Sequence, residues 1–179
     1  MSNLVDRAIR AAKLDVTLYE EVEVDQTALG QASAVVLLSS VAAGIGSALQ
    51  GGVGGLFLGA IAALIGWYVW AYLTYLIGTR LLPEPQTEAD VGQLLRATGF
   101  SSSPGLIRVL GIIPGLTAVV FLIASIWMLA AMVVAVRQAL DYSGTLRAVG
   151  VCVIGWIVQA IIVVLIIYLL GGSLTGLQP

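Results

Sequence analysis

The chain has 179 residues, of which 59% are apolar and only 10% are charged, and its formal net charge at pH 7 is -2. Soluble domains carry about 25% charged residues, so this chain has too few charges to cover a surface that faces water. The composition predicts an integral membrane protein and leaves no room for a second sizeable soluble domain.

The scarce residue types exclude several kinds of site. The sequence contains no histidine, which removes the commonest metal ligand and proton shuttle. Its one cysteine, Cys152, lies in an apolar run and cannot form a disulfide or a thiolate zinc site within the chain. The common hydrolase, metalloprotease and nucleotide-binding motifs are missing. The sequence therefore predicts no metal, no cofactor, no nucleic-acid partner and no enzymatic activity.

Residues 1–29 predict a charged cytoplasmic segment without a cleaved signal peptide. Apolar residues recur at helical spacing within residues 2–15, opposite Arg7, Arg10 and Lys13. This pattern suits an amphipathic helix in the lipid headgroup region; packing against the other helices is the alternative. Residues 16–29 are acidic, which predicts a solvated surface or, alternatively, a docking surface for a basic partner.

The rest of the chain predicts an all-α, polytopic membrane bundle over residues 30–171, followed by a short tail at 172–179. Five segments are long enough to cross a hydrocarbon core of about 30 Å. Their ranges are 30–50, 55–78, 88–113, 115–136 and 146–170. The third is expected to be a broken helix, because glycine, serine and Pro104 interrupt it at 99–105.

The positions of the basic residues favour five spans over four. With five spans, the flanking Lys and Arg residues all face the cytoplasm, as the positive-inside rule requires. If 88–113 does not cross, Arg137 and Arg147 flank an external turn. The sequence therefore predicts a cytoplasmic N-terminus and an external C-terminus, in a bacterial cytoplasmic (inner) membrane.

Two arginines, Arg96 and Arg108, fall within the third span. A buried arginine is costly unless it is paired or reaches an interface, and it is a candidate functional residue. Either side chain could extend to an interface or pair with Asp90 or Glu88. The sharper hypothesis is a contact to a lipid headgroup or another anion. Its residues are Arg96, Ser101, Ser102, Ser103 and Arg108.

Small and aromatic residues predict how the helices associate. Small residues four apart allow close packing between helices in lipid. The positions are Ser40, Gly44, Gly51, Gly55, Gly59 and Ala63. We expect them to pack the hairpin 30–78 on itself or on a second copy. Trp67, Trp127 and Trp156 fall near the middle of their spans, which predicts an aromatic cluster or a flat surface for a pigment, quinone or partner helix.

The order of these features resembles one known family, the Yip (Ypt/Rab-interacting protein) domain family, in its bacterial form. The resemblance covers nearly the whole chain. Its residues are Leu18-Tyr19-Glu20-Glu21-Val22, Gly30-Gln31-Ala32, Leu94-Leu95-Arg96-Ala97-Thr98-Gly99-Phe100, Pro104, Ile126-Trp127, Val134-Ala135-Val136-Arg137, Leu140-Asp141-Tyr142-Ser143 and Arg147-Ala148.

The resemblance implies five spans with a cytosolic N-terminus. Eukaryotic relatives bind prenylated Rab GTPases in vesicle trafficking, but their Asp-Leu-Tyr-Gly-Pro motif is absent here, where Glu20 follows Leu18 and Tyr19. Rab binding is therefore not carried over. Arg137, Asp141 and Arg147 match the family's cytoplasmic turn, where an ion pair between Arg137 and Asp141, four residues apart on a helix, is a sufficient structural explanation.

Together these features predict a non-enzymatic scaffold or accessory subunit. We expect it to bind membrane lipids, a partner membrane protein or a second copy of itself. The alternative function is a small-solute or anion channel or transporter built around the broken helix 88–113.

Overall fold

The computed structural model describes residues 3–47 and 56–175, with the side chains of 3–47 and 58–168. This part of the chain is helical and contains no strand. The short elements are α1 (Leu4–Ala12), α2 (Val16–Val24), the π-helix η2 (Ile77–Leu81), α6 (Val91–Phe100) and the 3₁₀ helix η3 (Ser103–Ile112). The long helices are α3 (Ala28–Gly46), α5 (Leu56–Leu76), α7 (Thr117–Ala139) and α8 (Thr145–Thr175).

Four helices are long and apolar enough to cross a membrane: Ala28–Gly46, Leu58–Leu81, Thr117–Ala139 and Thr145–Tyr168. Each corresponds to one of the five predicted spans and extends at most three residues beyond it. The predicted Gly51 and Gly55 fall outside the described residues.

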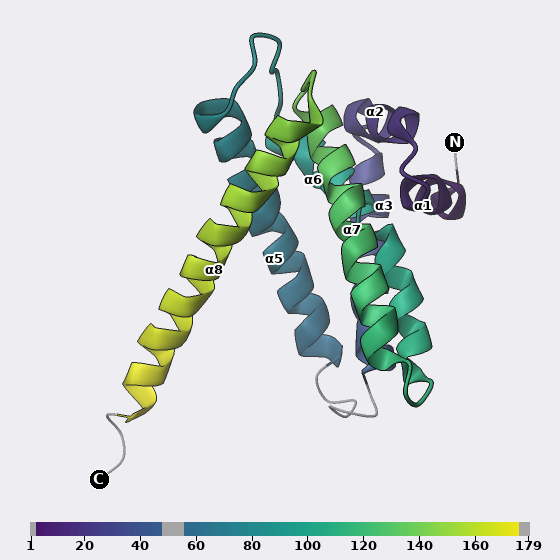
Figure 1. Ribbon diagram of the computed structural model, residues 1–179, viewed down its shortest axis with the longest axis vertical. Helices are drawn as coiled ribbons and strands as arrows, with labels where there is room; N and C mark the ends of the chain where they lie inside the picture. Colours follow the sequence, from purple (N-terminus) through teal and green to yellow (C-terminus); the bar gives the residue numbers. More distant parts are fainter. Residues whose placement is uncertain (1–2, 48–55, 176–179) are drawn as a thin grey trace.

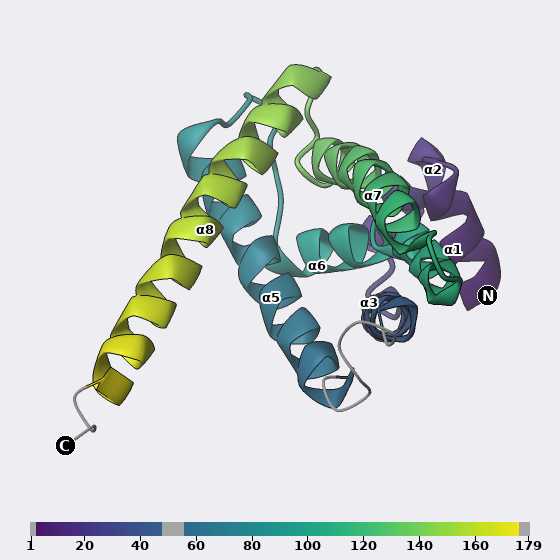
Figure 2. The ribbon, with the colours of Figure 1, turned by 60° about the horizontal axis from the view of Figure 1, so that its bottom comes forward.

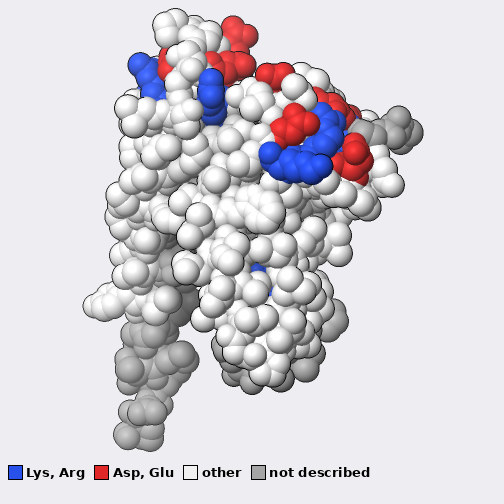
Figure 3. Space-filling model, turned by 45° about the vertical axis from the view of Figure 1, so that its right-hand side comes forward, with Lys and Arg blue, Asp and Glu red and all other residues white. Residues whose placement is uncertain are grey.

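One end of the bundle carries α1, α2, residues 82–90 and the turn at 140–144 (Figure 1). We call it the charged end, because the Asp, Glu, Lys and Arg side chains gather there (Figure 3). The opposite end, called the far end, carries the turn at 113–116. The helix α5 leads to the charged end, whereas α7 begins at the far end, so residues 91–112 take the chain from one end to the other.

This connecting segment consists of two short helices joined at Ser101 and Ser102. The helix α6 begins with a capping box, in which Asp90 and Gln93 satisfy each other's backbone N–H groups. It lies across the bundle in contact with α3, α5 and α7 (Figure 2). Pro104 sits in the first turn of η3. Because a 3₁₀ helix rises about 2 Å per residue, the ten residues of η3 cover about 20 Å.

Glycines allow the backbone of this segment to run close to α3 and parallel to it. A Cβ atom on Gly99 would lie 2.8 Å from that of Ala32, and one on Gly105 would overlap the Ser39 hydroxyl. A Cβ on Gly46 would overlap the carbonyl oxygen of Arg108. The residue numbers of the contacts rise together along α3 and the 99–111 segment, so the two backbones approach in parallel along most of the length of α3.

The small residues that the sequence predicts at helix-packing contacts lie in different surroundings from one another. At Gly59 a Cβ atom would meet open space, so this glycine packs against no described element. Ser40 and Ala63 line a cavity, described below. The carbonyl of Gly44 accepts a hydrogen bond of 3.3 Å from the Ser47 hydroxyl.

The buried core is concentrated toward the charged end, where α2, α6 and α7 meet. Its fully buried side chains include Leu18, Tyr19, Val22, Leu94, Phe100, Val136 and Leu140. In contrast, α8 packs against α7 near their connecting turn and then diverges from it (Figure 1). Most of its large apolar side chains beyond Cys152 are exposed.

We expect Gly46→Ala to lower the melting temperature in detergent by about 5 °C or more, because the new methyl group would meet rigid backbone at Arg108. Gly59→Ala, where a Cβ meets open space, should leave it unchanged or slightly raised. Thermal unfolding followed by circular dichroism measures both variants. Equal melting temperatures for Gly46→Ala and the wild type would contradict the close contact between α3 and η3.

Candidate functional site

A cavity of about 380 Å³ lies among α3, α5, α7, α8 and the broken segment. Its volume falls in the range typical of small-ligand sites, about 300–1,000 Å³. Apolar side chains such as Val36, Trp67 and Met128 form much of the wall. The polar side chains on the wall are Ser39, Ser40, Thr98, Ser102, Arg108 and Gln159.

Arg108 also lines a second cavity of about 310 Å³, which shares Met128, Met132 and Trp156 with the first. Its Nη2 donates a 3.4 Å hydrogen bond to the Ser125 hydroxyl, and its guanidinium carbon lies 5.6 Å from the centre of the Phe121 ring. Its Nε is buried and has no hydrogen-bond partner among the described residues. The side chain therefore keeps unused hydrogen-bonding capacity at the boundary between the two cavities.

No carboxylate of this chain lies near Arg108. The ten Asp and Glu residues all fall within residues 6–25, 84–90 and 141, at the charged end. Arg108 forms no ion pair within the described part of the chain, and the residues outside that part contain no acid. The predicted pairing with Asp90 or Glu88 does not form.

The structure brings together only part of the predicted anion contact. Ser102 and Arg108 line the same cavity. The Ser101 hydroxyl donates to the carbonyl of Thr98, and that of Ser103 to the carbonyl of Phe100, both at 2.7 Å. These two hydroxyls satisfy the helix that precedes them and turn away from the cavity.

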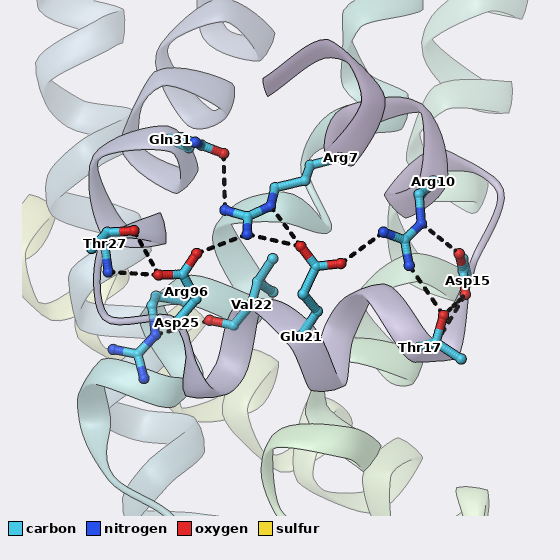
Figure 4. Close-up of polar contacts among 10 residues, drawn as sticks. All are labelled: Arg7, Arg10, Asp15, Thr17, Glu21, Val22, Asp25, Thr27, Gln31 and Arg96. Atoms are coloured by element: carbon cyan, nitrogen blue, oxygen red, sulfur yellow. Dashed lines mark hydrogen bonds and ion pairs between the residues drawn. The ribbon is translucent and has the colours of Figure 1, made fainter. Parts of the chain in front are cut away.

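Arg96 has a separate, structural position. Its buried guanidinium donates to the backbone carbonyls of Val22 and Glu23 at the end of α2 (Figure 4). A cation suits the carbonyl end of a helix, where the helix dipole is negative. This cap joins α6 to α2. Arg96 therefore follows neither predicted alternative, which were to reach an interface or to pair with a carboxylate.

The three predicted tryptophans do not form one cluster. Trp67 and Trp156 line the larger cavity, and the Trp67 indole donates to the Thr98 hydroxyl at 3.2 Å. The Trp127 indole instead donates to the carbonyl of Ala12 in α1 at 2.7 Å. The sequence analysis missed Trp70, which also lines the cavity. Its spacing of three residues from Trp67 on one helix face was the available signal.

The turn between α7 and α8 is held by contacts other than the expected Arg137–Asp141 pair. Arg137 donates to the carbonyls of Tyr142 and Ser143, both at 3.3 Å. Asp141 adopts a left-handed conformation with φ of 51°, because the helix has ended at Ala139 and the four-residue helical spacing no longer applies. The expectation of that ion pair was wrong.

Further contacts join this turn to residues 82–90. Arg147 pairs with Glu84 at 3.3 Å, and Glu84 accepts hydrogen bonds from the backbone and hydroxyl of Ser143. The Tyr142 hydroxyl lies within hydrogen-bond distance of the carbonyls of Gly78 and Leu82. The start of α8 is thereby fixed to the end of α5.

The acidic stretch at 16–29 has a basic partner within the chain itself (Figure 4). Arg7 pairs with Glu21 at 2.8 Å and with Asp25 at 2.7 Å. Arg10 pairs with Asp15 at 2.8 Å and with the second oxygen of Glu21 at 2.7 Å. Hydrogen bonds from Arg10 and Thr17 lower the pKa of Asp15 to about 2. These pairs fix α1 to α2.

The same pairing decides which face of α1 is exposed. Arg7 is buried against α2, whereas Val5 and Ile9 are 60% and 50% exposed. Leu4 and Ala8 pack against the core. The helix thus packs against the bundle and also presents apolar side chains outward, and its place in the lipid headgroup region stays a prediction.

Glu23 is a carboxyl at this end whose pKa is strongly raised. It is buried where α2 meets α6, and Gln93 donates to it at 3.2 Å. Burial, reinforced by the charge of Asp141, raises the pKa of Glu23 to about 7, although Arg96 acts in the opposite direction. Its charge therefore changes near neutral pH.

Comparison with known proteins identifies one match. The Yip1 domain family model matches residues 19–176, which is most of the chain. No curated protein and no solved structure matches it.

Arg7→Gln should release α1 from α2, because it leaves Glu21 and Asp25 without their buried cation. We expect amide hydrogen exchange in α1 to speed up about tenfold or more, with little change in α7. Lys13→Gln removes a cation that forms no ion pair with a described residue and serves as the control. Unchanged exchange in α1 of Arg7→Gln would show that the ion pairs do not hold this helix.

Glu23 should make stability depend on pH. Between pH 4.5 and about 7 the folded protein keeps a proton that the unfolded chain has lost, so stability falls as pH rises through this window. Glu23→Gln removes this penalty and should raise the melting temperature at pH 8 by about 4 °C, with little effect at pH 4.5. Asp6→Asn, on the exposed side of α1, should keep the wild-type profile. A parallel shift of Glu23→Gln at both pH values would contradict the assignment.

Proposed function

The chain belongs to the Yip1 domain family, and from this premise we propose that it is a non-enzymatic, five-span membrane protein that acts as a scaffold or accessory subunit. It binds membrane lipids or partner membrane proteins and resides in a bacterial cytoplasmic membrane. Its domains are a cytoplasmic segment at 1–29 and a transmembrane bundle at 30–171.

The path of the chain is the observation that carries the five-span arrangement. The helix α5 finishes at the charged end, whereas α7 starts at the far end (Figure 1). This path supports a crossing by residues 91–112. The polar backbone at Ser101–Ser102 is tolerated because it is surrounded by protein.

The distribution of cations supports a cytoplasmic charged end. Seven of the eight Lys and Arg residues lie on the elements of that end, and Arg108 is the exception. Because cytoplasmic flanks carry the excess of Lys and Arg, we place the N-terminal helices in the cytoplasm and the far end of α8 outside.

Two surfaces support binding of lipids or partner helices. The exposed Val5 and Ile9 suit α1 to the lipid headgroup region, with its charged face turned to α2. The diverging part of α8 exposes apolar side chains such as Ile157 and Val164, which lipid or a helix of another protein would cover. No observation favours a channel or transporter, and we do not propose one.

Thiol labelling in intact cells tests the topology. In a Cys152→Ser background, Ile113→Cys should react with an impermeant reagent, because the turn at 113–116 lies outside. Gly144→Cys, in the turn before α8, should be protected until the cells are opened. Four spans predict the opposite pattern, and that result would overturn the proposal. Both positions are accessible in the structure, since Ile113 is exposed and a Cβ at Gly144 meets open space.

A further inference from the structure

We propose that the cavity beside Arg108 binds the oxyanion of a membrane lipid, with the guanidinium as its counter-ion and the acyl chain lying between α7 and α8. The proposal rests on the five-span arrangement, which places Arg108 within the membrane. It names the ligand class for that arrangement and the residues that recognise it.

The positive charge of Arg108 needs a counter-ion. A cation inside a membrane is costly unless an anion or water compensates it. All ten carboxylates lie at the charged end, and those nearest the other arginines are already used by them. No Asp or Glu side chain is therefore left to balance Arg108, and a ligand from outside the chain can supply the counter-ion.

The side chain of Arg108 extends away from the nearer membrane interface. The carbonyl of Arg108 lies against Gly46, the last residue of α3, so the backbone is near the far end. The guanidinium reaches Ser125, eight residues or about 12 Å into α7 from its start at Thr117. The side chain extends into the bundle and away from the nearer interface, which excludes a simple extension to water on that side.

The wall of the larger cavity carries hydrogen-bond donors that suit an oxyanion. Arginine binds phosphate and carboxylate oxygens through its fork of N–H groups, and among the described residues the guanidinium of Arg108 has one hydrogen bond, of 3.4 Å, to Ser125. Ser40, Ser102 and Gln159 on the same wall carry further hydrogen-bond donors. A volume of about 380 Å³ accommodates a headgroup fragment.

The second cavity beside Arg108 is mainly apolar, which suits the acyl chain of a lipid. The second cavity, which Arg108 also lines, is formed mainly by Met128, Leu129, Met132 and Trp156. Trp156 of α8 is 59% exposed, and α8 diverges from α7 beyond their connecting turn (Figure 1). A lipid can enter sideways through this opening and place its chain on apolar side chains while its oxyanion meets Arg108.

Native mass spectrometry of the full chain, purified in mild detergent and stripped of lipid, tests the proposal. The probes are phosphatidylglycerol, phosphatidylcholine, oleate and inorganic phosphate, added separately. We expect one phosphatidylglycerol or one oleate per protein and little phosphatidylcholine. Quenching of tryptophan fluorescence by lipid with brominated chains should report the same occupancy, because Trp156 borders the chain.

Three variants separate the site from the bulk surface. Arg108→Gln should reduce occupancy at least tenfold, whereas Arg80→Gln, which removes an exposed arginine at the charged end, should match the wild type. Ala43→Leu keeps Arg108 but fills the cavity, and it should also lose the lipid. This variant decides the question if Arg108→Gln cannot be purified.

Each outcome has a defined meaning. Phosphatidylglycerol lost in both cavity variants supports a phospholipid as the source of the oxyanion, and oleate lost in the same way supports a fatty acid. Equal lipid occupancy in wild type and Arg108→Gln overturns the proposal, as does binding of inorganic phosphate without any lipid. The result is distinct from that of thiol labelling, which reports whether residues 91–112 cross and does not depend on Arg108.

Discussion

The separation of charge from apolar surface is the constraint on which this structure depends. A charged group is stable inside a membrane protein only if it is paired or reaches water. The chain meets this requirement by collecting its carboxylates and most of its cations at one end, where Arg7 and Arg10 pair with α2 and Arg147 pairs with Glu84. Arg96 meets it by capping the carbonyl end of α2. Arg108 is the exception, and we propose that a ligand in the cavities beside it supplies its counter-ion.

Away from the charged end, close contact between backbones holds the elements together in place of ion pairs. Within lipid, the association of helices gains little from the hydrophobic effect and depends on close packing. The contact between α3 and the 99–111 segment shows this plainly, because Gly46, Gly105 and Gly111 admit neighbouring atoms where a side chain would collide. The 3₁₀ form of η3 also helps, since it covers the required distance with few residues.

The sequence predicts the long helices well because their signal is local. The apolar runs 115–136 and 146–170 correspond to Thr117–Ala139 and Thr145–Tyr168, and the interruption expected at 99–105 lies where α6 and η3 meet. The partners of the charged side chains could not be predicted, because they are distant in sequence. Arg96 and the carbonyl of Val22 are 74 residues apart, and the acids facing α1 have no pattern that distinguishes them from a solvated surface. Trp70 was missed because position along a span says nothing about which face turns inward.

The anchoring of α8 has a mechanical consequence. Tyr142 and Arg147 fasten its first turn to η2 and residues 82–90, while its remaining length leaves α7. A helix of 31 residues is about 46 Å long. Tilting such a rod by about 10° around its fastened end displaces the free end by about 8 Å. Small adjustments in the turn at 140–144 are thus amplified into large changes in the width of the opening between α7 and α8.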